Sequence, residues 1–135
     1  MWLKDASCAD LAGTNSYGQA AWMTALTAAQ LLADGICDLS DSSVAGDWRL
    51  PSVNEFQSLS DYEYTYPALS NGAGTGQWTE GDVFWNVKSN EYWSSTSVAN
   101  QPWRAWDVNF AGGSAYTLRA KSLTFVYVWP VRGGL

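Results

Sequence analysis

The sequence predicts an α+β domain in which two helices pack on a small, mainly antiparallel sheet with long loops. Residues 104–110 alternate between apolar and polar side chains, which is the period of two of a strand with one buried face. Apolar side chains recur at helical spacing through residues 17–34, and Ser52-Val53-Asn54-Glu55 has the capping-box pattern that opens a second helix. The length of 135 residues suits one domain over 1–135.

The first helix is predicted to run from about Tyr17 to Asp34. Ser16 and Gln19 have the spacing of a capping box, with Ser16 as the N-cap and Gln19 reaching back to it. Gly35 suits the C′ position just past a helix, where a left-handed backbone conformation is common. We therefore expect an Ala-rich helix that packs closely on the sheet.

A short strand and the second helix come next. Asp47-Trp48-Arg49-Leu50 predicts the strand, which ends at the proline that follows it. The helix carries Phe56 and Leu59 toward the core. Arg49 and Glu55 are interpreted as a charged pair that fixes the helix start, rather than as a catalytic pair.

The last third of the chain contains the strongest strand patterns. Along Arg104–Phe110, the alternating side chains of Trp106, Val108 and Phe110 face the core. Asp107 and Asn109 are placed toward solvent or a ligand. Thr124–Val131 is almost continuously apolar, as expected of a central strand that is covered on both faces.

A tight turn is predicted between two of these strands. Gly112-Gly113 can adopt the positive φ that such a turn needs, so residues 114–119 should return as the partner strand. On that strand Ser114, Tyr116 and Leu118 are placed outward, on the same exposed face of the sheet as the polar residues before the turn.

Composition excludes several classes of function. A net charge of -6 with seven Lys and Arg argues against binding to nucleic acid or anionic membranes, and no apolar run is long enough to span a bilayer. The chain has no histidine, which removes His-dependent triads, His metal sites and imidazole bases. Nine Trp in a chain with 15% aromatic residues are interpreted mainly as core residues.

Cys8 and Cys37 flank the first predicted helix. They are compatible with a disulfide, which implies an oxidising location, or with two buried free thiols; the disulfide is preferred. Asp38–Ser43 is rich in Asp and Ser, but it lacks the Gly and the distal Glu of an EF-hand loop. We interpret it as a polar turn and predict no metal and no cofactor.

Residues 61–90 show little periodicity. Asn71–Gly76 has the composition of a flexible loop, and its glycine spacing lacks the strand and helix of a nucleotide-binding motif. Trp78 and Trp85 either pack this long segment onto the core or belong to a binding surface. The packing interpretation is preferred.

Three motifs together resemble one domain family. They are Gly46-Asp47-Trp48-Arg49-Leu50-Pro51, Tyr92-Trp93-Ser94-Ser95-Thr96 and Val128-Trp129-Pro130-Val131-Arg132-Gly133-Gly134. The resemblance is to the family typified by the C-terminal domain of the Legionella collagen-like adhesin, and it implies a C-type lectin-like fold over nearly the whole chain. Met1–Asp5 resembles the latter part of a strand that opens the family's domain, so the chain is expected to be a piece of a longer protein.

Some members of that family resemble the variable proteins of diversity-generating retroelements, in which adenine-directed mutagenesis rewrites chosen codons while the fold is kept. In the C-terminal third, residues that match the family pattern alternate with residues that depart from it. The departures include residue types that are enriched at interfaces. The candidate ligand-contacting, variable positions are Gln101, Trp103, Arg104, Asp107, Asn109, Ala111, Ser114, Tyr116, Leu118, Arg119, Leu123 and Phe125.

The resemblance therefore implies a ligand-binding display domain with variable C-terminal residues. Such a domain recognises a protein or glycan on another cell or particle. It implies an extracellular, cell-surface or virion-surface location, and oligomer formation stays open. The alternatives are a fixed adhesin that binds polysaccharide, which the acidic balance disfavours, and a structural domain that trimerises or caps a fibre. An enzyme is not expected, because Ser94-Ser95 has no histidine to activate it and neither cysteine matches the oxidation site of the formylglycine-generating enzyme, a relative by fold.

Overall fold

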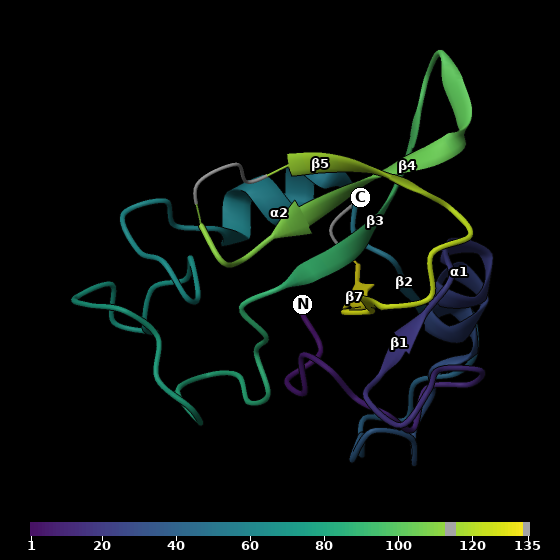
Figure 1. The fold of residues 1–135 in the computed structure, drawn as a ribbon. Helices are drawn as coiled ribbons and strands as arrows, with labels where there is room; N and C mark the ends of the chain where they lie inside the picture. The colour runs from purple at the N-terminus through teal and green to yellow at the C-terminus, as the bar shows by residue number, and fades with distance from the viewer. Residues whose placement is uncertain (113–115, 134–135) are drawn as a thin grey trace.

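The computed structural model describes residues 1–112 and 116–133 (Figure 1). Two helices lie against a mixed five-stranded sheet of order β1-β6-β3-β4-β5, and a separate two-stranded sheet pairs β2 with β7. The elements are β1 (Gln19–Ala20), α1 (Trp22–Leu31), β2 (Trp48–Arg49), α2 (Val53–Leu59), β3 (Glu91–Val98), β4 (Gln101–Asn109), β5 (Tyr116–Ala120), β6 (Val126–Tyr127) and β7 (Val131–Arg132). The predicted α+β class is confirmed, and the arrangement is consistent with a C-type lectin-like fold.

The predicted return strand is confirmed where the structure describes it. β5 pairs antiparallel with β4, and β4 pairs antiparallel with β3 in a long hairpin that projects from the rest of the domain (Figure 1). Gly112 has a φ of 102°, and a side chain there would meet Thr65 of the neighbouring loop. Gly113 and Ser114 lie outside the described residues.

The first helix is shorter than predicted. It begins at Trp22, and its N-cap is Ala21, whose side chain forms no capping hydrogen bond. Gln19 cannot take part in a capping box, because it lies in β1 and pairs with Tyr127 of β6. The Asn15 side chain organises the preceding turn by accepting hydrogen bonds from the backbone N–H groups of Tyr17 and Gln19. The predicted Ser16 capping box is therefore wrong.

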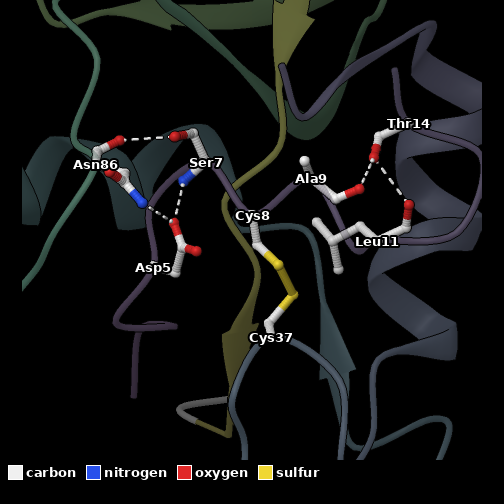
Figure 2. Close-up of a disulfide and its surroundings, with 8 residues drawn as sticks. All are labelled: Asp5, Ser7, Cys8, Ala9, Leu11, Thr14, Cys37 and Asn86. Atoms are coloured by element: carbon white, nitrogen blue, oxygen red, sulfur yellow. Dashed lines mark hydrogen bonds between the residues drawn. A yellow bond between two sulfur atoms is a disulfide. The ribbon is translucent and has the colours of Figure 1, made fainter. Parts of the chain in front are cut away.

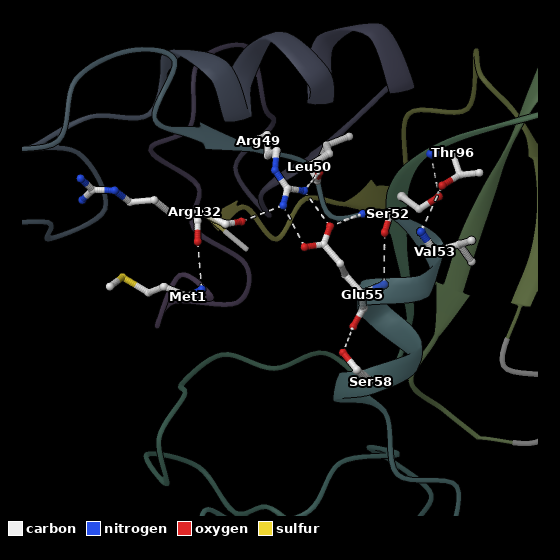
Figure 3. Close-up of polar contacts among 11 residues, drawn as sticks. Met1, Arg49, Leu50, Ser52, Val53, Glu55, Ser58, Thr96 and Arg132 are labelled. Atoms are coloured by element: carbon white, nitrogen blue, oxygen red, sulfur yellow. Dashed lines mark hydrogen bonds and ion pairs between the residues drawn. The ribbon is translucent and has the colours of Figure 1, made fainter. Parts of the chain in front are cut away.

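The second capping box is confirmed (Figure 3). The Ser52 hydroxyl accepts from the Glu55 N–H at 3.2 Å, and the Glu55 carboxylate accepts from the Ser52 N–H at 2.8 Å. Arg49 donates two bonds to the same carboxylate, at 2.6 and 2.9 Å, and a third to the Gly133 carbonyl. The guanidinium of Arg49 lowers the pKa of Glu55. The ion pair thus ties β2, α2 and the end of β7 together, as a structural pair should.

The apolar run Thr124–Val131 is not one central strand, which corrects the prediction. Only Val126–Tyr127 joins the five-stranded sheet, and the chain then crosses to the small sheet, where Val131 pairs with Arg49. The connection passes through the core: Trp129 is 0% exposed, and its indole N–H donates to the Leu3 carbonyl at 2.7 Å. Burial between two sheets produces the same apolar run as burial within one sheet.

Aromatic rings form the centre of the core. Trp129 contacts Trp2, Phe84, Tyr92 and Phe110, with ring centroids between 5.1 and 5.8 Å apart. Phe56, from α2, packs on Tyr92 and Phe110, so α2 covers this face of β3 and β4. Such tilted and edge-on contacts are the favoured geometries of aromatic pairs.

The two tryptophans of the long segment pack against the domain. Trp78 is buried, and its indole N–H donates to the Phe84 carbonyl at 3.2 Å. Trp85 is half-buried, and its backbone bonds to Lys4 and Ala6 of the N-terminal segment. The packing interpretation is confirmed for both. None of the helices within 1–112 and 116–133 has the length and apolar composition needed to cross a bilayer.

Cys8 and Cys37 form the predicted disulfide (Figure 2). Their Cα atoms are 5.9 Å apart, and the bridge joins positions separated by 29 residues. On the other side of Cys8, the Ser7 hydroxyl donates to the Asn86 carbonyl and the Asn86 amide donates to Asp5. The N-terminal segment is therefore held both to the exit of α1 and to the long segment before β3.

Candidate recognition surface

The pairing of β4 with β5 decides which candidate side chains share a face. Asp107 pairs with Thr117, Trp106 with Leu118, and Val108 with Tyr116. Directly paired residues of antiparallel strands point to the same face. Tyr116 and Leu118 therefore lie on the α2 side of the sheet, opposite to Asp107, and the predicted common outward face is wrong.

Asp107 is buried, although it was predicted to face solvent or a ligand. It is 0% exposed, and the Thr117 hydroxyl donates to its Oδ1. Its Oδ2 lies 3.7 Å from the Arg119 guanidinium, which also binds Glu91 through two hydrogen bonds. Sequence alternation identified the correct opposite face but could not show that cross-strand partners cover this carboxyl group.

Tyr116 is held by the start of the long segment, in the loop that follows α2. Its hydroxyl contacts that of Tyr62, and the two rings meet edge-on at 6.5 Å between centroids. Burial is the main cause that raises the pKa of Tyr116 above its ordinary value. This side chain joins β5 to the loop, while Tyr62 itself is 54% exposed.

Two candidate positions are plainly exposed, namely Trp103 at 60% and Phe125 at 53%. The role of all the candidate positions as ligand contacts, including these two, stays a prediction, and Ser114 lies outside the described residues. The half-buried positions are Gln101, Arg104, Asn109, Ala111, Tyr116, Leu118, Arg119 and Leu123.

The two exposed aromatics come from neighbouring segments of the chain. We call the residues Tyr17, Gln19, Trp103, Lys121 and Phe125 of these segments the hairpin surface. The Lys121 N–H donates to the Trp103 carbonyl at 2.9 Å, and the Gln19 side chain donates to the Phe125 carbonyl at 3.1 Å. Tyr17 precedes Gln19 in the turn and is 69% exposed.

Lys121, one residue of this surface, is held in place by several contacts. Its carbonyl accepts from the N–H of Trp22 at 3.0 Å, and its ammonium group lies 4.1 Å from the centroid of the Trp22 ring. A cation over an aromatic ring is attracted by the ring's negative face. The same ammonium donates to Ser97 at 2.6 Å. Lys121 thereby joins the start of α1 to the ends of β3 and β5.

Tyr17 was missed in the sequence because it was assigned to the first helix. The signal that identifies it is local: Asn15 and Gly18 surround it, and both residue types favour turns. A large aromatic at a turn is not needed to build a helical face.

Comparison with protein families gives a match to the model of the Lcl C-terminal domain over residues 1–132. The chain belongs to the Lcl C-terminal domain family. The predicted resemblance is confirmed, and the family is associated with adhesins and not known as catalytic. Searches of curated proteins and of solved structures gave no match.

The disulfide and the membership of an adhesin domain family both suggest that this Lcl C-terminal domain is part of an extracellular or surface protein. Neither finding bears on which positions vary. The family assignment supports the adhesin interpretation and gives no support to diversification by a retroelement.

Charge is distributed unevenly in this Lcl C-terminal domain. Residues 11–33 and 95–127, which supply the hairpin surface, contain one acidic residue, the buried Asp107, and three basic residues. The rest of the sequence contains twelve acidic and four basic residues. The net negative charge of the whole chain therefore does not apply to the segments that supply this surface.

Two further features of the described parts of this Lcl C-terminal domain concern possible sites away from the hairpin surface. Within the described parts, no group of three or more His, Cys, Asp or Glu side chains could hold a metal ion. A cleft of about 410 Å³ beside Leu26, Gln30 and Ser95 contains the Arg49–Glu55 pair. The helix cap already occupies both charged groups.

Proposed function

We propose that this Lcl C-terminal domain is a recognition module that binds its ligand through the hairpin surface. The observation that carries the proposal is that three exposed aromatic residues, Tyr17, Trp103 and Phe125, come from segments that hydrogen bonds join to one another, with Lys121 bonded to Trp103 and Gln19 to Phe125. Exposed apolar patches commonly mark interaction sites. Aromatic side chains supply large contact areas and lose little conformational entropy on binding.

The charge of this region supports a ligand that is itself negatively charged. Lys121 belongs to the hairpin surface, and the one carboxyl group in the segments that supply this surface is buried. A surface without exposed carboxylates attracts anions even when the chain as a whole is acidic, because screening limits interactions to about 10 Å. The ligand class is therefore an anionic glycan or an acidic protein surface.

Substitution of two of these exposed aromatics, Trp103 and Phe125, tests the surface. We expect Trp103→Ala with Phe125→Ala to weaken binding to immobilised dextran sulfate or polyglutamate at least about tenfold, since interface aromatics often contribute more than 1.4 kcal/mol each. The thermal midpoint should stay within a few degrees, because both side chains are more than half exposed.

Tyr66→Ala is the matched control, because Tyr66 is 73% exposed but lies in the loop next to Gly112. It should bind like the unmodified domain. Unchanged binding by the double variant, together with a loss in the control, would refute the hairpin surface. Sedimentation of the same proteins measures their oligomeric state. It distinguishes ligand binding from the alternative of a structural domain, in which the double variant would lose assembly rather than ligand binding.

We also propose a narrower form of this function, in which codons of residues 101–125 are diversified by a retroelement. A rewritten position must tolerate many side chains. The exposure of Trp103 and Phe125 supports this, whereas buried Asp107 is unsuited to it.

Sequencing the gene and its flanking DNA across the source population tests the narrower form. We expect substitutions at the codons of Trp103 and Phe125, matched to adenines of a nearby near-repeat, and a constant codon for Asp107. Equal conservation of all three codons would reject diversification and leave a fixed adhesin domain.

A further inference from the structure

Two carboxyl groups and one guanidinium meet on the face of the sheet opposite α2. Glu91 comes from β3, Asp107 from β4 and Arg119 from the edge strand β5. Glu91 is 8% exposed and Asp107 is 0% exposed. The Arg119 side chain therefore reaches across β4 to bind a residue of the central strand.

The hydrogen bonds of this cluster leave one oxygen without a donor. Arg119 donates to both oxygens of Glu91, at 3.0 Å from Nε and by a shorter contact from Nη2. Thr117 donates to Oδ1 of Asp107. Oδ2 of Asp107 is buried and has no hydrogen-bond partner among the described residues; Nε of Arg119 is 3.7 Å away. A buried carboxylate oxygen without a donor is costly.

The charges also fail to balance if both acids are ionised, because one guanidinium faces two carboxylates. Among the described residues, the neighbouring elements α1, β1 and β6 offer no further cation, because they contain no charged residue. Lys121, on the same face of the sheet, is held by Trp22 and Ser97. Neutralising one carboxyl group is the less costly solution.

The expected titration agrees with this geometry. Burial, with a smaller contribution from the neighbouring Glu91, raises the pKa of Asp107 from 3.8 to about 7. Two interacting carboxyl groups behave in this way when a single proton satisfies both.

We propose that Asp107 holds a proton up to near-neutral pH and donates it from Oδ2 toward Glu91, so that Glu91, Asp107 and Arg119 form a proton-dependent clamp between edge strand β5 and central strand β3. The clamp goes beyond the proposed recognition role and does not depend on it. Loss of the proton places a second negative charge beside one guanidinium and weakens the attachment of β5.

The direction of the pH effect follows from linkage. The folded domain binds this proton more tightly than the unfolded chain does. The contribution of Asp107 to stability is therefore fully present below about pH 4 and is lost as the pH rises through about 7.

Asp107→Asn tests the clamp, because the amide keeps the shape, supplies a permanent N–H donor toward Glu91 and cannot ionise. We expect the thermal midpoint of the variant minus that of the unmodified domain to become steadily more positive between pH 5 and pH 8. Glu63→Gln, at an exposed position outside the cluster, should keep the unmodified pH profile. A difference that is constant across this range would overturn the proposal.

Carbon NMR of the unmodified domain tests the same proton without any variant. The Asp107 carboxyl resonance should titrate at least two pH units above an ordinary aspartate. Titration below pH 5 would show that Asp107 is ionised at neutral pH and would also overturn the proposal, even if the asparagine variant does not fold.

Discussion

Trp129→Ala should lower the free energy of unfolding by about 3–5 kcal/mol, the usual effect of truncating a fully buried tryptophan. The side chain is 0% exposed and contacts four aromatic rings, and its indole N–H is bonded to the Leu3 carbonyl at 2.7 Å. Small domains are stable by only about 5–15 kcal/mol, so this loss removes a large part of the total. Urea unfolding followed by circular dichroism measures it.

Trp129→Phe is the matched control, because it keeps a ring in the core and removes the indole N–H. We expect it to destabilise the domain clearly less than the alanine variant, while Trp103→Ala should change stability little. The ranking matters more than the values. If Trp103→Ala and Trp129→Ala were equally destabilising, the connection between the two sheets would not be the centre of the core.

The predictions that proved correct rest on patterns a few residues long. The capping box at Ser52 and Glu55 is complete within four residues. The alternation along β4 places apolar and polar side chains on opposite faces, and a glycine turn makes the return of β5 local. The class of the fold could therefore be predicted from the sequence.

The errors concern partners that are distant in the sequence. Gln19 pairs with Tyr127, and this contact, rather than a local cap, decides where α1 begins. The register of β5 also depends on the length of its turn, and a shift by one residue exchanges the two faces of a strand. Periodicity alone could not place Tyr116 and Leu118.

The candidate surface, like the fold, could be predicted only in part from the sequence. Trp103 and Phe125 were identified as candidates, and both are exposed. Asp107 shows why a polar residue on the polar face of a strand need not be a ligand contact. Asp107 lies in a cluster with Arg119 from one neighbouring strand, and Arg119 also binds Glu91 from the other. No local pattern reports both.

The disulfide has the second large expected effect. Replacing both Cys8 and Cys37 by alanine should lower the free energy of unfolding by about 2–4 kcal/mol, since a cross-link of this span removes much of the freedom of the unfolded chain. The segments it joins contain few regular elements: residues 1–18 precede β1, and 32–47 separate α1 from β2. Denaturant unfolding with and without a reducing agent measures the effect.

Reduction supplies the control for this prediction. The unmodified domain in reducing agent should unfold near the same denaturant concentration as the double alanine variant, whereas the variant should not respond to the reductant. The bonds from Ser7 and Asn86 remain after reduction, so the N-terminal segment should stay docked and the domain should still fold. A midpoint that does not move in either experiment would mean that these bonds alone hold the segment, and that the disulfide is dispensable for stability.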